Sequence, residues 1–335
     1  MKKVGIIGAS GFAGEELVKF LNLHSASSLI AVSSRELKDK NMSNYVEETN
    51  LTFVDPDDDI FFKCDVIFFA TPHGVSMEKA KSYLENGIKV IDLSADFRLK
   101  DPETWKKWYG TKHTDLENLE KSVYGLTELN SEKIKDANLI AVPGCYPTAS
   151  ILALAPLMES GFNIDSITID AKSGISGAGR STVENNLRDE IKENFRAYAT
   201  SGHRHLPEIE QTLVEIYGHE LSINFLPHLI PAMRGIYATT YVNFVDDSKK
   251  SFVDVYNKFY EDSPNVSIMP EGEIPEILKV SRTNNCQIGL YPSAIDNQIV
   301  IISAIDNLVK GAAGQAMECY NLICGHKQTE GLTNG

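Results

Sequence analysis

Cys145 is the residue of this chain best suited to covalent chemistry. It lies in the segment VPGCYPT, after an apolar stretch with the pattern of a strand and before TASILALAPLME, which has the pattern of a helix. A cysteine at such a turn faces the positive end of a helix dipole, which favours the thiolate. It also follows a strand end, where α/β folds build their sites. We therefore expect Cys145 to be a nucleophile, although most unpaired cysteines are buried structural residues.

The other cysteines lack this context. The chain has five, an odd number, and no CxxC motif, so neither a disulfide framework nor a zinc site is expected. We expect no metal cofactor, and we interpret the remaining four thiols as buried spectators: Cys64, Cys286, Cys319 and Cys324.

Two histidines flank an arginine in the segment SGHRHLPEI. Alternation places His203 and His205 on one side of an extended segment, with Arg204 on the other. A helix is predicted over 207–217, and its positive end disfavours an imidazolium at His205. We therefore favour His203 as the acid/base, His205 as a substrate contact and Glu208 as an orienting carboxylate. The spacing alone does not separate the two histidines.

A glycine-rich turn follows the first predicted strand. Its GxxGxxG pattern is a variant of the dinucleotide-binding fingerprint, in which a tight turn and a helix N-terminus approach the pyrophosphate. The strand before it and the helical pattern after it favour this interpretation over an ordinary turn. The expected cofactor contacts are Gly8, Ser10, Gly11, Phe12, Ala13 and Gly14.

The end of the second predicted strand indicates which dinucleotide is bound. Sites specific for NAD usually have an acidic residue here, which binds the ribose hydroxyls. This chain has Ser33, Ser34 and Arg35 instead, and these suit a 2′-phosphate. We therefore expect NADP, with Ser33 and Arg35 as contacts. Glu36, which follows them, instead favours NAD, and Arg35 could be an ordinary surface residue.

The elements that must position these residues are of two kinds. Short apolar stretches alternating with helical patterns predict a doubly wound, Rossmann-type α/β domain with a parallel sheet. Later segments are β-rich with few helices between them, which predicts an α+β domain with a mostly antiparallel sheet. The predicted strands are 3–8, 29–33, 65–70, 89–94 and 138–144, followed by 164–173, 222–230, 235–245 and 298–306, with a helix within 249–262.

A chain of 335 residues is long enough for two domains. We expect a dinucleotide-binding domain over 1–145 and a catalytic and oligomerisation domain over 146–305. A C-terminal helix within 306–335 should return to the first domain, with a loose tail over 328–335. One exposed sheet face in the second domain favours a homo-oligomer, either a dimer or a tetramer.

The charge balance restricts the partners. With 32 Lys and Arg against 46 Asp and Glu, the formal net charge is −14, so nucleic acid and anionic membranes are not expected partners. The longest apolar run, 151–158, is too short to span a membrane. Glycines and glutamates break the N-terminal apolar stretch before it could act as a signal peptide. We therefore expect a cytoplasmic protein. The acidic run 55–59 is interpreted as a solvated loop.

Six motifs occur in a familiar order: GASGFAGEEL, ATPHGVS, DLSADFR, VPGCYPTA, SGISGAGR and HRHLPEI. Together they resemble the N-acetyl-gamma-glutamyl-phosphate reductase family of arginine biosynthesis, from residue 3 to about residue 320. The resemblance implies NADPH-dependent reduction of N-acetyl-L-glutamyl 5-phosphate to the 5-semialdehyde, with release of phosphate, through a thioester at Cys145. It alone supplies the acetylated glutamate.

Two other kinds of activity remain open. One is the same chemistry on N-acetyl-aminoadipyl phosphate, in lysine biosynthesis, or on aspartyl phosphate. The other is a non-catalytic NADP-binding regulator, against which the position of Cys145 argues.

The substrate that the resemblance implies carries a phosphate and a carboxylate, so cationic groups should converge on it. Arg98 in DLSADFR and Arg180 in SGISGAGR are the candidates, and either could instead form a structural ion pair. Backbone N–H groups of the SGISGAG loop, with Ser176 and Gly177, are expected near the nicotinamide. Asn307 is similar to the asparagine that binds the nicotinamide amide in this family, and it could also cap the last helix.

Overall fold

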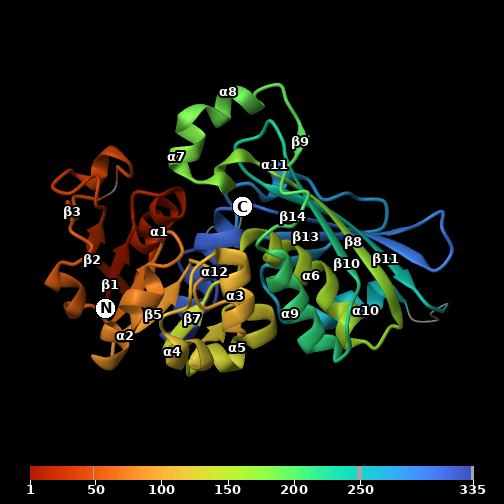
Figure 1. The fold of residues 1–335 in the computed structure, drawn as a ribbon, viewed down its shortest axis with the longest axis horizontal. Coiled ribbons are helices and arrows are strands. Elements are labelled where there is room, and N and C mark those ends of the chain that lie inside the picture. Colours follow the sequence, from red (N-terminus) through yellow and green to blue (C-terminus); the bar gives the residue numbers. More distant parts are fainter. Residues whose placement is uncertain (48, 247–250, 333–335) are drawn as a thin grey trace. The chain divides into compact units, whose positions relative to one another are not determined.

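The computed structural model describes residues 1–47, 49–246 and 251–332. These residues form two compact units (Figure 1). Residues 1–144 and 312–332 make up the first unit, and residues 145–311 make up the second. No helix in the described part of the chain is long and apolar enough to cross a membrane.

The first unit is built on a seven-stranded sheet in the order β3-β2-β1-β4-β5-β7-β6. All six pairings among its described strands are parallel. The strand order reverses on either side of β1, as in a doubly wound dinucleotide-binding fold, so this part of the fold prediction is confirmed. The strands are β1 (Lys2–Ile7), β2 (Ser27–Ser33), β3 (Phe53–Val54), β4 (Val66–Phe69), β5 (Lys89–Asp92), β6 (Val123–Tyr124) and β7 (Leu139–Ala141).

The predicted strands of this unit correspond to the five inner strands of the sheet. Most of their residues are buried, because a parallel sheet is covered by helices on both faces. The two edge strands, β3 and β6, are only two residues long and gave no sequence signal. The helices are α1 (Phe12–Leu23), α2 (Ser76–Glu85), α3 (Pro102–Tyr109), α4 (Leu116–Lys121), α5 (Thr127–Lys135) and α12 (Gly314–Ile323), with short turns η1 (Met42–Asn44) and η2 (Asp59–Lys63).

The C-terminal helix α12 contacts α1, α5 and β5 within the first unit. Residues after it do not form the loose tail that was expected. Asn321 Nδ2 donates to the carbonyl oxygens of Gln328 and Glu330 at 2.8 and 2.9 Å, and Ser25 Oγ donates to Glu330 Oε1 at 2.7 Å. Residues 333–335 lie outside the described residues.

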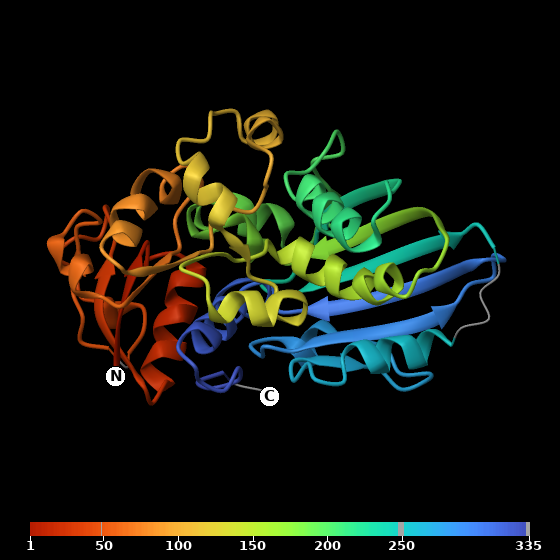
Figure 2. The ribbon, with the colours of Figure 1, turned by 90° about the horizontal axis from the view of Figure 1, so that it is seen from below.

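The second unit contains another seven-stranded sheet, in the order β12-β13-β14-β11-β8-β10-β9. Figure 2 shows its long strands running side by side next to the helix α6. The strands are β8 (Ile164–Ser173), β9 (Arg196–Ala197), β10 (Ile223–Leu229), β11 (Ile236–Phe244), β12 (Val266–Ile268), β13 (Cys286–Pro292) and β14 (Gln298–Ile305).

This sheet is mixed, so the prediction of a mostly antiparallel sheet is confirmed only in part. Four described pairings are antiparallel, but β8 pairs with β10, and β12 with β13, in parallel. A parallel pair needs a long crossover. The segment between β8 and β10 supplies one, because it contains α9 (Leu206–Tyr217). The same segment also holds the short turns η3 (Ile175–Ala178), α7 (Arg180–Thr182), η4 (Val183–Leu187) and α8 (Arg188–Ile191).

One face of the second sheet packs against helices. Along β11 the residues alternate between buried and more exposed, and α6 (Cys145–Glu159) contacts β11 and β14. Ser303 Oγ on β14 donates to the carbonyl oxygen of Ala149 on α6 at 3.0 Å. The remaining elements are α10 (Phe252–Phe259), α11 (Ile277–Val280) and η5 (Val309–Ala313). The helix predicted within 249–262 is α10, and residues 249 and 250 lie outside the described residues.

Candidate active site

Cys145 is the first residue of α6, a helix of 15 residues. Its side chain lies where the helix dipole favours an anion, as the sequence predicted. It is partly exposed, whereas Cys64, Cys286 and Cys319 are buried. Burial and the nearby charge of Asp65 together raise the pKa of the Cys64 thiol to about 12. Burial also raises the pKa of Cys324. These two cysteines are therefore poor nucleophiles at neutral pH.

Gly311 lies directly against Cys145. A Cβ atom added at Gly311 would be 2.8 Å from the Cβ of Cys145 and 3.3 Å from Cδ1 of Ile305. Carbon atoms in contact normally stay at about 3.5–4.0 Å. Only glycine therefore leaves the nucleophile in its present position, and the sequence gave no signal of this contact because the two residues are 166 positions apart.

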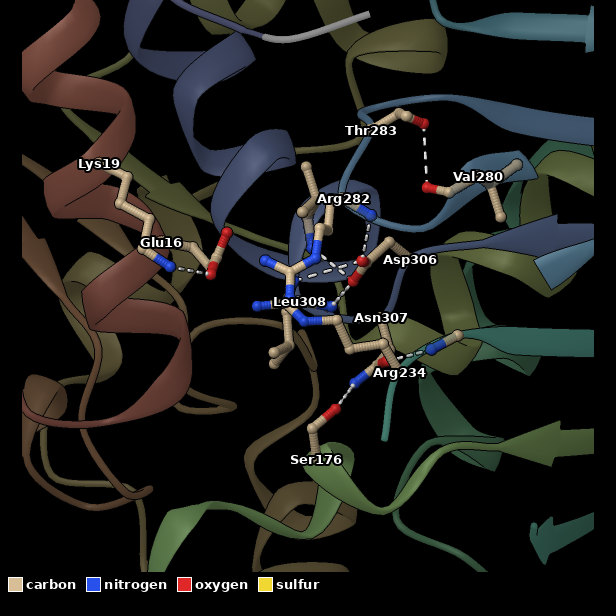
Figure 3. Close-up of polar contacts among 12 residues, drawn as sticks. Glu16, Lys19, Ser176, Arg234, Val280, Arg282, Thr283, Asp306, Asn307 and Leu308 are labelled. Atoms are coloured by element: carbon tan, nitrogen blue, oxygen red, sulfur yellow. Dashed lines mark hydrogen bonds and ion pairs between the residues drawn. The ribbon is translucent and has the colours of Figure 1, made fainter. Parts of the chain in front are cut away.

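Asp306 fixes the segment that carries Gly311 (Figure 3). Its Oδ1 accepts hydrogen bonds from the backbone N–H of Leu308 at 2.8 Å and of Val309 at 3.3 Å. Its Oδ2 accepts from the backbone N–H of Arg282 at 2.6 Å and from Nη1 of Arg234 at 3.3 Å. The cap of this segment is therefore Asp306. The expectation that Asn307 could cap the last helix was wrong by one residue.

Asn307 instead connects two loops of the second unit. Its Oδ1 accepts from the backbone N–H of Gly235 at 2.7 Å, and its Nδ2 donates to Ser176 Oγ at 2.9 Å. The side chain is 2% exposed. Asn307 therefore holds the SGISGAG loop, and an amide with these two contacts has one N–H and one lone pair left for a cofactor.

The SGISGAG loop does not present its backbone N–H groups as expected. Those of Gly174, Ile175 and Ser176 donate to the carbonyl oxygens of Gly235, Ala232 and Met233 at 2.8–3.0 Å. Those of Gly177 and Gly179 donate within the loop itself. These five donors already have partners inside the protein, so contacts of Ser176 or Gly177 to a cofactor would have to use other atoms.

The two histidines lie beside the residue that follows the nucleophile. The ring of Tyr146 is 5.5 Å from the ring of His203 and 5.9 Å from that of His205, measured between centroids. The two imidazoles are 4.8 Å apart, and α6 contacts α9. The structure therefore brings the HRH segment and the start of α6 together. Sequence reasoning missed Tyr146 and Tyr198, although Tyr198 Oη donates to Tyr146 Oη at 3.0 Å.

The surroundings of His203 work against the role expected for it. Tyr146, Tyr198 and Phe225 surround its ring at centroid distances of 5.5–5.6 Å. Burial and, to a smaller extent, the charge of Arg204 together lower the pKa of His203 to about 4. Its Nδ1 accepts the backbone N–H of His205 at 3.1 Å. His203 is therefore neutral at physiological pH, and the expectation that it could remain protonated as the acid/base is not supported.

His205 and Glu208 lie at the start of α9. His205 is the N-cap residue of this helix, and Glu208 is in its first turn, 1% exposed. The dipole favours a carboxylate there and opposes an imidazolium at the cap. A buried carboxylate next to the histidine segment suits the orienting role that the sequence suggested for Glu208.

The guanidinium of Arg98 donates hydrogen bonds to two backbone carbonyl oxygens. Its Nε donates to the carbonyl oxygen of Val142, and its Nη2 donates to that of Leu93, both at 2.8 Å. The side chain is 9% exposed. Two arms of the guanidinium therefore tie the loop after β5 to the end of β7, a role the sequence did not suggest. Arg180, the other candidate, forms an ion pair with Glu184 at 3.2 Å.

Asp96, in the same motif as Arg98, also binds backbone groups. Its Oδ1 accepts from the backbone N–H of Gly74 at 2.7 Å. Its Oδ2 accepts from Ser76 Oγ at 3.0 Å and from the backbone N–H of Met77 at 3.1 Å. Burial and the nearby charge of Asp96 raise the pKa of Asp92. The DLSADFR segment thus holds the loops that follow β4, β5 and β7 in the first unit.

The glycine-rich turn has the geometry that a dinucleotide requires. Gly8 has φ +89°, and a Cβ there would lie 2.6 Å from the carbonyl oxygen of Ala70. A Cβ on Gly14 would lie 2.6 Å from Cα of Ala9, so this glycine allows α1 to approach the turn. Gly11 is the N-cap of α1 and provides no side-chain cap. Ser10, Phe12 and Ala13 lie in this turn and the first turn of α1, at the end that attracts phosphate.

The hydroxyls after β2 differ in what they can reach. Ser33 is fully buried, and its Oγ accepts the backbone N–H of Gly8 at 3.3 Å, so it supports the turn and is poorly placed to contact a 2′-phosphate. Ser34 Oγ accepts from Ser10 Oγ at 3.0 Å, and Arg35 is exposed. Ser10, Ser34 and Arg35 therefore fit a phosphorylated ribose better than the predicted Ser33.

No cluster of three or more His, Cys, Asp or Glu side chains in the described ranges is arranged to hold a metal ion. All five cysteines are reduced thiols. The chemistry that the described residues suggest rests on Cys145 and the histidine segment in the second unit, and separately on the nucleotide-binding turn in the first.

Comparison with family models divides the chain as the two sheets do. A model described as "Semialdehyde dehydrogenase, NAD binding domain" matches residues 3–137. Another, "Semialdehyde dehydrogenase, dimerisation domain", matches residues 145–307.

Curated relatives match the chain over nearly its whole length. An N-acetyl-gamma-glutamyl-phosphate reductase of Ruthia magnifica subsp. Calyptogena magnifica is 44% identical over 337 residues, covering 99% of this chain and 98% of the relative. Proteins of the same name from Nitrosomonas europaea and Pseudomonas fluorescens are also 44% identical, covering 99% and 100% of this chain and 98% of each relative.

Solved structures share the fold at low sequence identity. An aspartate semialdehyde dehydrogenase II of Vibrio cholerae, complexed with ASA, has a TM-score of 0.76 and 15% identity, covering 97% of this chain and 98% of that chain. An aspartate semialdehyde dehydrogenase of Candida albicans with NADP has a TM-score of 0.71 and 18% identity, with the same coverage.

Proposed function

Because the chain belongs to the N-acetyl-gamma-glutamyl-phosphate reductase family, we propose that it catalyses the NADPH-dependent reduction of N-acetyl-L-glutamyl 5-phosphate. The products are N-acetyl-L-glutamate 5-semialdehyde and phosphate, and the reaction belongs to arginine biosynthesis. The observation that carries the chemistry is the position of Cys145 at the first residue of α6, next in the chain to Tyr146, whose ring lies beside those of His203 and His205.

The reaction starts at the sulfur of Cys145. The thiolate attacks the acyl carbon, and the bond from this carbon to the phosphate oxygen breaks. Phosphate departs, and a thioester remains on the enzyme. NADPH, when bound, supplies the hydride that reduces this thioester. The resulting hemithioacetal collapses by breaking its C–S bond, which releases the aldehyde and restores the thiolate.

His205 is the better candidate for the acid/base. Burial and Arg204 hold His203 in its neutral form, so His203 is assigned to orientation and substrate contact. His205 takes the proton of the Cys145 thiol and stays close as its imidazolium partner. Glu208, buried in the first turn of α9, orients this imidazole and offsets the opposing helix dipole.

The residues of the first unit suit NADP. Gly8 and Gly14 permit the close approach of backbone to pyrophosphate. Arg35, beside the hydroxyls of Ser10 and Ser34, suits the 2′-phosphate. A charge-assisted contact contributes about 1.5–3 kcal/mol, so NADPH should bind about 10–100-fold more tightly than NADH. Equal efficiency with both would mean that Arg35 does not recognise the phosphate.

The domain roles follow from the two units. The second unit begins at Cys145 and extends to Gly311, rather than over the expected 146–305. We therefore propose that residues 1–144 with 312–332 bind the dinucleotide and that 145–311 carry catalysis and self-association. The less buried face of the β8–β11–β14 sheet, away from α6, is the proposed contact between subunits of a dimer. Equilibrium sedimentation would separate monomer, dimer and tetramer.

The five cysteines are reduced thiols, and this fits a cytoplasmic location of the protein.

The decisive assay is phosphate-dependent reduction of NADP by N-acetyl-L-glutamate 5-semialdehyde. The one-carbon-longer N-acetyl-aminoadipate semialdehyde and unacetylated aspartate semialdehyde serve as competing substrates. We expect the highest kcat/KM with the acetylated glutamate. A higher kcat/KM with either analogue would reassign the substrate, and no turnover with any of the three would refute the proposed activity.

A further inference from the structure

A group of charged side chains lies where β2 and β3 end, outside the residues that the motifs identify. Ser33 pairs with Val54, and the backbone N–H of Ser34 donates to the carbonyl oxygen of Val54 at 3.3 Å. Asp55 directly follows Val54 and Arg35 directly follows Ser34, so both residues lie just beyond this end of the sheet. In a dinucleotide-binding fold, this end of β2 is where the adenosine ribose is recognised.

Lys79, on α2, reaches the same place from a third segment. Its Nζ forms an ion pair with Oδ1 of Asp57. The Lys79 side chain is 18% exposed and that of Asp57 is 70% exposed. Burial and the charge of Arg35 lower the pKa of Lys79, while Asp55 raises it. Asp57 is two residues after Asp55, so the ion pair brings the Lys79 ammonium to the end of β3, the strand next to β2, which Arg35 follows.

The acidic residues of the loop 55–59 differ in how they are held. Some carboxylates bind backbone N–H groups of the loop, and one contacts only a lysine side chain. Asp55 Oδ1 accepts the backbone N–H of Asp57 at 3.0 Å, and its Oδ2 pairs with Lys38 at 3.4 Å. Asp58 caps η2 through the backbone N–H of Ile60 at 2.9 Å. The Asp57 carboxylate, by contrast, is well exposed and contacts Lys79, so a stronger anion can replace it without disturbing the turn.

A phosphate monoester is such an anion, because it carries about −1.5 to −2 charges at neutral pH. We propose that Lys79 is a second cationic contact for the 2′-phosphate of NADPH, and that Asp57 holds the Lys79 ammonium until the phosphate displaces it. Arg35 binds the phosphate as a planar fork and Lys79 as a point charge. This assignment rests on the proposed use of NADPH and makes Lys79 a specificity-determining residue.

If the phosphate displaces Asp57 from Lys79, substitutions of these two residues should change phosphate affinity in opposite directions. Lys79→Met removes one of two cations, so it should weaken binding of the 2′-phosphate about 10-fold and leave the rest of the nucleotide unaffected. Asp57→Asn removes the competing anion, so it should strengthen binding of the same phosphate by about 3–10-fold.

Calorimetric titration of the full-length protein tests this without turnover. The probes are adenosine 2′,5′-bisphosphate and adenosine 5′-monophosphate, which differ only in the 2′-phosphate. Lys81→Met is the matched control, since Lys81 is on the same helix and pairs with Glu85 and Glu117. It should bind both probes as the wild type does. Lys79→Gln provides a second variant, and a thermal melt checks that each protein is folded.

The outcomes separate the two levels of the proposal. Wild-type protein that binds both probes equally would refute the use of NADP itself. Wild type that prefers the bisphosphate, with the preference unchanged in Lys79→Met and Lys79→Gln, would overturn the role of Lys79 alone. Asp57→Asn that binds the bisphosphate no better than wild type would overturn the displacement. A selective loss at Lys79 with a selective gain at Asp57 supports both parts.

Discussion

Gly311 and Cys145 are packed so closely that a Cβ at position 311 would lie 2.8 Å from the Cβ of the nucleophile and 3.2 Å from its Cα. Gly311→Ala must therefore move one of them. Overpacking of this kind costs about 1–3 kcal/mol, and a shift of the reacting atom by about 1 Å can lower the rate about 100-fold. We expect a large fall in kcat with unchanged NADPH binding. Wild-type kcat in this variant would show that the contact does not position the sulfur.

Cys145→Ser should abolish turnover and leave NADPH affinity intact. A serine hydroxyl does not ionise near neutral pH even at a helix N-terminus, whereas a thiol there does. The measurement is steady-state turnover alongside fluorescence titration of NADPH. Cys324→Ser is the matched control, because it removes another partly exposed thiol. Substantial turnover by Cys145→Ser would be incompatible with a thioester.

The two histidines should separate in their kinetic effects. His205→Asn should slow single-turnover hydride transfer and alkylation of Cys145, since it removes the proposed imidazolium partner. His203→Asn should mainly raise KM, because its imidazole is already neutral at pH 7 with a pKa of about 4. Both variants are measured between pH 5 and 9. If His203→Asn loses the hydride step and His205→Asn keeps it, the two roles are reversed.

The pKa of His203 also predicts how stability depends on pH. The imidazole titrates at about 4 in the folded protein and near 6.5 in the unfolded chain. Between these values the unfolded state binds more protons, so stability falls as the pH is lowered from about 6.5 to 4. One pKa unit corresponds to about 1.4 kcal/mol, so the difference between about 6.5 and about 4 sets an upper bound of about 3.5 kcal/mol. His203→Gln should lose less stability than wild type in urea unfolding at pH 5 compared with pH 7. An equal loss in both proteins would assign the acid sensitivity elsewhere.

Arg98→Lys should reduce stability as well as activity. Lysine keeps the charge but cannot reach the carbonyl oxygens of both Leu93 and Val142, as the guanidinium does. Leaving a buried carbonyl without its donor costs about 1–3 kcal/mol. Arg180→Lys is the control, because the pair that Arg180 forms with Glu184 is partly exposed to solvent and contributes little to stability. A raised KM with an unchanged melting temperature in Arg98→Lys would indicate that Arg98 only binds substrate.

The features that the sequence could predict are local ones. The turn at Gly8, the helix that starts at Cys145 and the strand β8 each depend on residues within a few positions of one another. Periodicity and turn chemistry therefore suffice for them. The short edge strands and the parallel pair β8–β10 depend on where the chain returns, which local pattern does not encode.

The residues whose roles changed all depend on distant neighbours. His203 loses its expected charge because Tyr146, Tyr198 and Phe225 come from three other segments to surround it. Ser33 is a buried residue that supports the turn, because its hydroxyl oxygen accepts the backbone N–H of Gly8. Pairs such as Lys79 with Asp57 could not be identified from spacing, since nothing in either segment indicates the other.

The helix α6 has a consequence for efforts to change what the enzyme accepts. Nearly every residue after Cys145 in this helix is buried, including Pro156. Substitutions along this helix would disturb the packing of the core, whatever their effect on the substrate. Libraries aimed at a new acyl group should therefore leave the helix intact and vary only the exposed side chains between residues 181 and 197, whose replacement leaves the core undisturbed.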